Sequence, residues 1–241
     1  STTTPAGAPK DNLRQAMSEL QDAVRRHPDT YGAALCKSAI EEIGMHSLQV
    51  TVEEASLPNQ PLLYQLEYKN LSKVWTKVVP VSAFGRWNES VDWEKQLDKL
   101  NSIRSVQQRV WTLNNPGDYY AHKTELSLEG LPVGHYVLMA AADESFSDKK
   151  GYVVFSEFTV TNLAPLRISE RYAEKFVIAH RATGEPLAGV KGDFYKQEWD
   201  YNRSKTVFKH IGNAVSDQNG MVAFEQQTDF SPIAIFSLGK D

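Results

Sequence analysis

Residues 131–141 read LPVGHYVLMAA, a turn sequence that leads into an apolar run. Pro132 and Gly134 are typical turn residues, and residues 136–141 contain no charged side chain. A strand with one face in water alternates apolar and polar residues, whereas a strand covered on both faces is apolar throughout. The stretch therefore predicts a central β-strand, packed against a facing sheet on one side and against a second layer on the other.

The segments around this run have the two-residue period of half-buried strands. Apolar residues alternate with polar ones over residues 48–52 and 62–68. Pro80 indicates that the end of its strand lies at a sheet edge, because proline cannot donate a ladder hydrogen bond. Together with NLSKVWTKVV, SVQQRVWTL, AHKTELSLEG and YVVFSEFTV, these segments predict about seven strands between residues 46 and 161, the number typical of an antiparallel β-sandwich.

Before residue 46, apolar residues recur at helical spacing and predict two antiparallel helices. Asp29 or Thr30 is the expected N-cap of the second helix, and Gly44 is its expected end. Two helices bury little surface by themselves, so this hairpin either packs on the following domain or ends a helical array.

A third helix is expected inside the sandwich sequence. Trp93, Leu97 and Leu100 share one helical face and predict a helical insertion near residues 90–103. This insertion and the N-terminal helix pair are the two candidates for the second layer over the central strand.

Further strand patterns begin near Leu163 and continue to the end of the chain. Asn219-Gly220 predicts a tight hairpin with positive φ at both residues. The short linker TNLAP predicts two sandwiches at a fixed angle. The fold class is therefore mainly β, with a linker and helical hairpin over 1–45 and two tandem seven-stranded β-sandwiches of the macroglobulin or immunoglobulin type over 46–162 and 163–241.

Composition excludes several functions for these 241 residues. The net charge of −4 comes from 26 basic and 30 acidic residues without a dominant block, so neither nucleic acid nor an anionic membrane surface is an expected partner. The first ten residues lack the apolar centre of a signal peptide and look like a linker, so any targeting segment is expected upstream. The single cysteine, Cys36, excludes an internal disulfide and is expected to be a small core residue.

The chain contains no recognisable catalytic or phosphate-binding motif. Its six histidines are scattered, and His122 and His135 are the one pair that could face each other across a hairpin. Acidic residues in the loop after the central strand could offer calcium oxygens, but their spacing matches no calcium loop: Asp143, Glu144 and Asp148. We therefore expect no catalytic residue, no metal, no cofactor and no small-molecule substrate.

Aromatic residues alternate with polar ones in YKQEWDYNRSK, residues 195–205. Tyr195, Trp199 and Tyr201 are the candidate residues of a surface for a carbohydrate or protein partner. The alternative is that Tyr195 and Trp199 cover the edge of a small core. A glycan-active enzyme is disfavoured because no paired carboxylates accompany these aromatics.

The segments QPLLYQLEYKNLSKVW, HKTELSLEGLPVGHYVLMAA, FSEFTVTNLAPLRI and RATGEPLAGVKGDFY with SDQNGMVAF resemble the N-terminal macroglobulin-like domains of bacterial alpha-2-macroglobulin proteins. The resemblance extends over residues 46–238, and the preceding helices resemble the helical region of large envelope-anchored members from Bacteroides-like organisms. It implies a segment of a long protease trap in the bacterial cell envelope, periplasmic and anchored as a lipoprotein through an upstream segment. The implied partners are the remaining domains of the parent protein and the proteases it traps.

Many members of that family couple proteases through a C-x-E-Q thioester motif. FEQQT supplies Glu225 and Gln226 without the cysteine, and Cys36 is followed by KSA, so the motif does not carry over to this chain. The second half of the chain also resembles the accessory sandwiches of carboxypeptidases and outer-membrane receptors. That resemblance implies the alternative function, a stalk or docking module of a surface receptor or adhesin.

Overall fold

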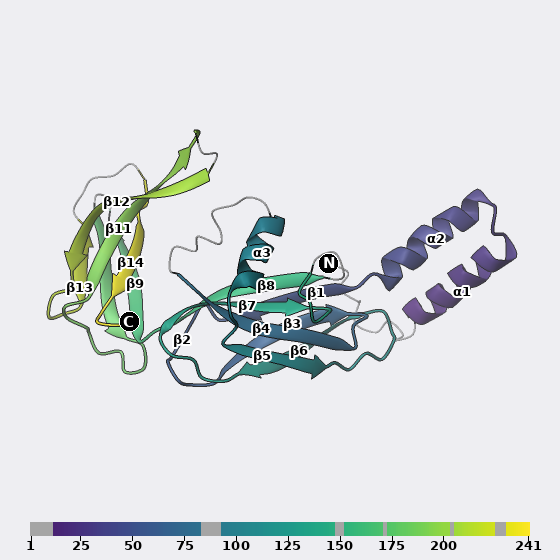
Figure 1. Cartoon of the computed structure of the whole chain (residues 1–241), viewed down its shortest axis with the longest axis horizontal. Helices are drawn as coiled ribbons and strands as arrows, with labels where there is room; N and C mark the ends of the chain where they lie inside the picture. The colour runs from purple at the N-terminus through teal and green to yellow at the C-terminus, as the bar shows by residue number, and fades with distance from the viewer. Residues whose placement is uncertain (1–11, 83–92, 148–151, 171–172, 203–204, 225–229) are drawn as a thin grey trace.

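The computed structural model describes residues 12–82, 93–147, 152–170, 173–202, 205–224 and 230–241. Two β-sandwiches follow each other along the chain, and a pair of helices projects from the far end of the first sandwich (Figure 1). This architecture confirms the predicted fold class. Among the described residues, no helix has the length and apolar character that crossing a membrane requires.

The first sandwich is built from two sheets whose long strands are all antiparallel. One sheet has the order β1 (Ser47–Val52), β3 (Leu62–Lys69), β6 (Ala121–Leu128). The other has the order β2 (Ala55–Ser56), β8 (Val153–Val160), β7 (Gly134–Ala141), β4 (Lys73–Val81), β5 (Gln107–Thr112). These seven long strands match the predicted number, and the two-residue β2 adds a short parallel pairing with β8.

Strand β7, which contains the apolar run, lies in the middle of the five-stranded sheet. It pairs with β8 on one side and with β4 on the other, and every residue from Tyr136 to Ala141 is buried. Tyr136, Leu138 and Ala140 join the core between the two sheets. Val137, Met139 and Ala141 point the opposite way into a second cluster, so both faces of the strand are covered as predicted.

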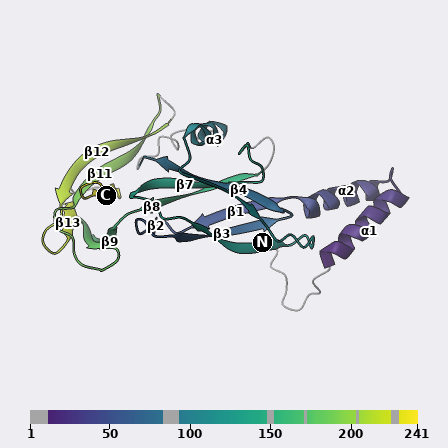
Figure 2. The same cartoon turned by 60° about the horizontal axis from the view of Figure 1, so that its bottom comes forward.

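Helix α3 (Trp93–Ser102) covers the second cluster. Leu97 and Leu100 are buried against the outer face of β7, and Trp93 stacks on Phe155 of β8 at a centroid distance of 5.0 Å. Figures 1 and 2 show the helix lying over this sheet. The expectation of a helical insertion as the second layer is correct.

Polar contacts fix the end of α3 on the sheet. Lys77 Nζ donates a hydrogen bond to Asn101 Oδ1 at 2.7 Å, and Asn101 Nδ2 donates to the Phe146 carbonyl at 3.0 Å. The Lys77 ammonium also lies 4.3 Å from the centre of the Phe146 ring. Because burial disfavours the charged amine, the pKa of Lys77 is lowered from its ordinary value.

The N-terminal helices α1 (Asn12–Arg26) and α2 (Tyr31–Gly44) pack against each other, as predicted. Thr30 caps α2 by accepting a hydrogen bond from the Ala33 amide at 3.1 Å. Among the residues of these helices, only Met17 and Ala33 are buried. This pair therefore has little core of its own.

The helix pair does not cover β7, contrary to the second of the two expectations for that layer. It extends away from the end of the sandwich (Figures 1 and 2). Asn70, in the β3–β4 turn, donates to the carbonyls of Ile43 and Met45 at 3.0 and 3.1 Å, and Lys69 donates to the Glu42 carbonyl at 3.3 Å. These bonds satisfy carbonyls that the end of a helix leaves free, so they hold α2 end-on to the sandwich.

The second sandwich contains six strands in the described residues, against the seven expected. One sheet has the order β13 (Met221–Phe224), β10 (Ala173–His180), β9 (Leu163–Glu170). The other has the order β12 (Lys205–Val215), β11 (Lys191–Asp200), β14 (Ile233–Ser237). Between them lies a smaller core of buried residues: Leu163, Phe176, Ile178, Val190, Phe194, Val222 and Phe224.

The predicted Asn219-Gly220 hairpin is wrong. Strand β12 pairs with β11, and β13 pairs with β10 in the facing sheet, so the turn between them carries the chain from one sheet to the other. Of the two residues, only Gly220 has a positive φ, +74°. Asp217 closes the turn by accepting hydrogen bonds from the amides of Asn219 and Met221. Local turn chemistry specifies a reversal of the chain but not the strand that pairs next.

The linker between the sandwiches is bonded on both sides. The Thr161 amide donates to the carbonyl of Ser56 in the first sandwich at 2.9 Å. The Asp241 carboxylate, which follows β14, accepts hydrogen bonds from the Thr161 hydroxyl at 2.5 Å and from the Asn162 amide at 2.7 Å. These contacts tie the linker to both sandwiches. The fixed angle between the sandwiches stays a prediction.

Replacing Leu100 tests the role of α3 as the second layer. Leu100→Ala leaves a cavity over β7 and is expected to lower the free energy of unfolding by about 2–5 kcal/mol in urea titrations. Leu63→Ala, at an exposed position of β3, is the control and is expected to change it by less than about 0.5 kcal/mol. Equal effects of the two substitutions would contradict the role of α3 as the apolar layer that covers β7.

Candidate partner surface

The three aromatic residues singled out in the sequence lie on the β11–β12 hairpin. Tyr195 pairs with His210 and Trp199 pairs with Thr206, while Tyr201 follows β11 in the turn. The register shifts between Phe194 and Tyr195. Because side chains alternate along a strand, Phe194 is buried in the core while Tyr195 and Trp199 lie on the outer face of the same sheet.

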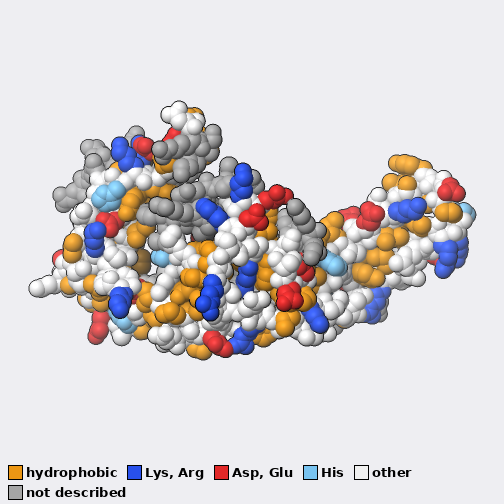
Figure 3. All heavy atoms as spheres, in the orientation of Figure 1, with side chains coloured by type: hydrophobic (Ala, Val, Ile, Leu, Met, Phe, Trp, Pro, Cys, Tyr) orange, Lys and Arg blue, Asp and Glu red, His pale blue; other side chains and the backbone are white. Residues whose placement is uncertain are grey.

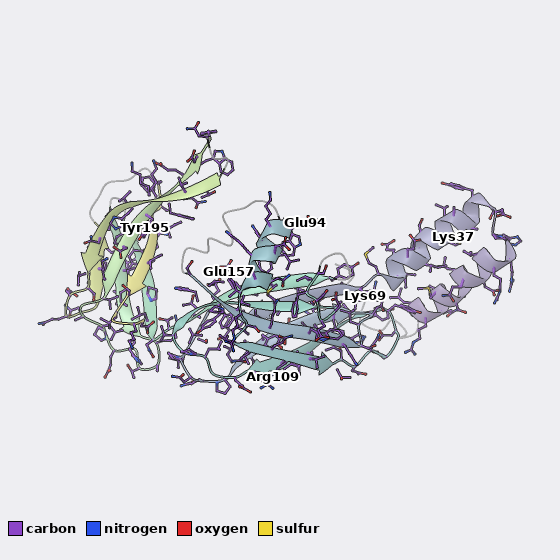
Figure 4. All side chains as sticks on the ribbon, viewed as in Figure 1. Lys37, Lys69, Glu94, Arg109, Glu157 and Tyr195 are labelled. Atoms are coloured by element: carbon purple, nitrogen blue, oxygen red, sulfur yellow. The ribbon has the colours of Figure 1, made fainter. Side chains whose placement is uncertain are left out.

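Tyr195 is held at the base of the hairpin by its neighbours. Its ring meets His210 edge-on at a centroid distance of 5.1 Å. His210 Nε2 lies 3.2 Å from Asp193 Oδ1, and Lys191 Nζ lies 2.8 Å from the other carboxylate oxygen. The Lys191 hydrogen bond, followed by that of His210, lowers the pKa of Asp193. This end of the surface is therefore an ordered polar and aromatic cluster, where Figure 4 labels Tyr195.

Toward the tip of the hairpin the aromatic residues become exposed. Trp199 is 46% exposed and Tyr201 is 85% exposed. Neither belongs to the buried core of the second sandwich, so the alternative that Trp199 covers a core edge has no support from its position. The assignment of Tyr195, Trp199 and Tyr201 to a partner surface stays a prediction.

The two histidines considered as a facing pair across a hairpin do not lie on one hairpin. His122 is on β6 and His135 is on β7, and these strands belong to different sheets. His122 Nε2 lies 2.8 Å from Asp118 Oδ1, whereas His135 Nδ1 lies 3.0 Å from the Thr159 hydroxyl. Each ring therefore has a structural partner of its own.

The acidic loop also has a structural explanation. Asp143 Oδ1 accepts hydrogen bonds from the Ser145 amide at 2.8 Å and from the Ser145 hydroxyl at 2.5 Å, which closes a turn. Asp148 lies outside the described residues, as do Glu225 and Gln226. Within the described part of the chain, no three His, Cys, Asp or Glu side chains lie close enough to hold a metal ion. Cys36 is half-buried on α2 rather than part of a core.

A groove that the sequence did not indicate runs along β5. It has a volume of about 500 Å³ and is lined by Val106, Gln107, Gln108, Arg109, Val110, Trp111 and Glu129. Figure 4 labels Arg109 at this edge of the first sandwich. The hydrophobic pattern does not distinguish an edge strand from a central one here, because pairing partners are decided by the folded chain.

Charged side chains of both signs are scattered over the face in Figure 3 without a block of one sign. This distribution agrees with the small net charge of −4. The aromatic hairpin and the β5 groove are two local features of the described surface.

No family model matches the chain, and no curated protein is similar to it at a significant level. Among solved structures it is similar to the crystal structure of native Escherichia coli alpha-2-macroglobulin spanning domains MG0-NIE-MG1, with a TM-score of 0.53 and 15% identity. This match covers 78% of the chain and 63% of the MG0-NIE-MG1 fragment. The NIE-MG1 fragment of the same protein matches with a TM-score of 0.51 and 15% identity, over 78% of the chain and 92% of that fragment.

The tandem sandwiches thus have the fold of macroglobulin-like domains. More particularly, they follow the fold of the NIE-MG1 region of bacterial alpha-2-macroglobulin. The resemblance predicted from the sequence motifs is confirmed at the level of the fold.

Two aromatic substitutions on β11 separate core from surface. Phe194→Ala is expected to lower the free energy of unfolding by about 3–5 kcal/mol, because it removes a fully buried ring that stacks on Phe224. Trp199→Ala is expected to change it by less than about 0.5 kcal/mol. Chemical denaturation checks both, and a large loss from Trp199→Ala would restore the interpretation as a core cover.

His135 makes stability depend on pH. Burial lowers its pKa below the ordinary value of 6.5, so the unfolded chain takes up this proton first as the pH falls. Neutral His135 makes its full contribution to the free energy of unfolding above pH 6.5. As the pH falls below 6.5, this contribution decreases by at most about 1.4 kcal/mol per pH unit, the value for one proton. His135→Gln is expected to reduce the pH dependence of the free energy of unfolding, measured by urea titration, below about pH 6.5. An unchanged slope in the variant would contradict this assignment.

Proposed function

We propose that this chain is a structural segment of an alpha-2-macroglobulin-like protease inhibitor of the bacterial cell envelope. The observation that carries the proposal is the order of two sandwiches with the fold of NIE-MG1, joined by a short linker. The matched structures are of alpha-2-macroglobulin from Escherichia coli, and the sequence motifs of both halves agree with that fold. In this role the segment holds neighbouring domains in place and catalyses no reaction.

The bonded junction supports a scaffold role. Thr161 is bonded to Ser56 of the first sandwich and to Asp241 of the second. Arg181 adds a hydrogen bond from its guanidinium to the Leu163 carbonyl at 2.9 Å and one from its amide to the Asn162 carbonyl at 2.6 Å. A segment that must hold two domains in register within a larger assembly benefits from such a restrained junction.

Two carboxylates with lowered pKa values have structural partners, which is in keeping with a scaffold role. Asp118, in the loop before β6, accepts a hydrogen bond from the Tyr120 amide and is bonded to His122 of β6, and these bonds lower its pKa despite partial burial. Asp193 is held by Lys191 and His210 on the surface of β11. Each of these pairs is explained by a loop or a strand that it stabilises.

The finer parts of the proposal concern the whole protein. We place it in the periplasm, anchored to the membrane as a lipoprotein, with the remaining domains of the parent protein and the trapped proteases as its partners. The second candidate is an accessory stalk or docking module of a surface receptor or adhesin. It is favoured by the second sandwich, whose exposed aromatic hairpin is suited to docking.

A protease assay on the full-length parent protein tests this function. A protease mixed with the parent protein is expected to lose activity on a large protein substrate while it keeps its activity on a small peptide substrate. The 241-residue chain is the control and is expected to leave both rates unchanged, because sequestration requires the rest of the protein. Equal activity on both substrates in the presence of the parent protein would contradict the inhibitor and favour the stalk.

A further inference from the structure

The first sandwich is closed along one side and open along the other. On the closed side β1 lies beside β8 of the facing sheet, and the chain then crosses to pair β2 with β8. On the open side the two edge strands are β5 and β6. Side chains bridge part of this gap: Gln107 exchanges two hydrogen bonds with the Glu129 backbone, at 2.9 and 3.1 Å, and Arg109 forms an ion pair with the Glu129 carboxylate.

Strand β5 presents unpaired backbone groups at this opening. The Leu113 amide donates to the Ser72 carbonyl, which sets the alternation of the β4–β5 ladder. Backbone groups of every second residue from there, Trp111, Arg109 and Gln107, therefore face β4. Those of Gln108, Val110 and Thr112 face away from the sheet, where the described residues provide no strand to pair with them.

The other edge strands carry the features that discourage strand addition, or are covered. Lys123 lies on β6, Pro165 on β9 and Lys209 on β12. Strands β1, β13 and β14 lie against strands of the facing sheets, and β2 has two residues. Strand β5 has neither lysine nor proline, and its one charged side chain, Arg109, is neutralised by Glu129.

The side chains around β5 indicate which side chains a strand added at this edge must carry. Val106 and Val110 are more than half exposed beside the groove. Exposed basic residues lie near both ends of the edge: Arg104 three positions before β5, and Lys73 opposite Thr112. Neither has an ion-pair partner among the described residues. A peptide segment with an apolar middle and acidic ends is complementary to these exposed valines and to the basic residues at the two ends of the edge.

We propose that the β5 edge binds an extended peptide segment of about six residues, apolar at alternate positions and acidic at both ends, as an added antiparallel strand. The incoming backbone pairs with Gln108, Val110 and Thr112, and its apolar side chains lie on the face of Val110. The antiparallel direction follows the long strand pairs of this sandwich. The proposal is independent of the protease-inhibitor function.

The first test uses a synthetic peptide, acetyl-Asp-Val-Thr-Val-Thr-Val-Glu-amide, added to the 241-residue chain. Hydrogen exchange followed by NMR is expected to slow at least about tenfold at the amides of Gln108, Val110 and Thr112, because these become ladder donors. Amides of β12, an edge strand in the second sandwich, are expected to exchange at an unchanged rate. Failure of the three β5 amides to slow at saturating peptide would overturn the proposal.

Two N-methylated peptides test the hydrogen-bonding geometry. In an antiparallel pair, directly opposite residues share a face, so valines beside Val110 point their own N–H groups toward β5. Methylating the three valine nitrogens is expected to abolish binding, and methylating the two threonine nitrogens is expected to preserve it. Equal affinity of both methylated peptides would exclude strand addition.

Matched valine variants of the protein complete the test. Val110→Lys places a charge on the proposed edge and is expected to weaken peptide binding at least about tenfold in fluorescence anisotropy. Val215→Lys on β12 is the control, because Val215 is 60% exposed and Val110 is 58% exposed. Both variants are expected to keep the wild-type urea midpoint, so lost binding cannot reflect unfolding.

Two results would assign the edge differently. Equal binding by Val110→Lys and Val215→Lys would place the peptide elsewhere and overturn the proposal. Protection of the same three amides without peptide, rising with protein concentration, would assign the edge to a second copy of this chain and overturn it as well.

Discussion

The burial of β7 on both faces is the constraint on which the first sandwich depends. Six consecutive apolar residues cannot face water on either side, so the strand needs a sheet against Leu138 and a separate layer against Met139. Helix α3 supplies that layer and is locked by Lys77, Asn101 and the stacked Trp93. The helical insertion is therefore part of the core rather than an accessory of the loop that carries it.

The central position of β7 also decides where the edges of the molecule lie. With β8 and β4 on either side of it, β5 becomes the last strand of its sheet. The other sheet closes against β8 through β1, which leaves the opposite side open between β5 and β6. The same arrangement that buries the apolar run thus exposes the backbone groups of Gln108, Val110 and Thr112. Stability in the middle of the sheet and an exposed edge are two results of one strand order.

Much of the fold was predictable because its signals are local. The two-residue period identified the strands, the apolar stripe of Leu97 and Leu100 identified α3, and Thr30 was a correct N-cap candidate. The candidate sites were less predictable. His122 and His135 are close in sequence but belong to different sheets, and Asn219-Gly220 joins two sheets instead of two paired strands. In both cases the missing information was which strands pair, and that depends on residues far away in the chain.

The sequence by itself determined that the protein is mainly β, where its helices lie, and that β7 is covered on both faces, because hydrophobic periodicity and capping act over a few residues. The tertiary structure alone decided which layer covers β7, which strands are edges, and that the N-terminal helices stand end-on to the sandwich, held by Lys69 and Asn70. Those outcomes depend on the competition of whole surfaces for burial. A pattern of apolar residues specifies how much surface must be buried, but not the partner that buries it.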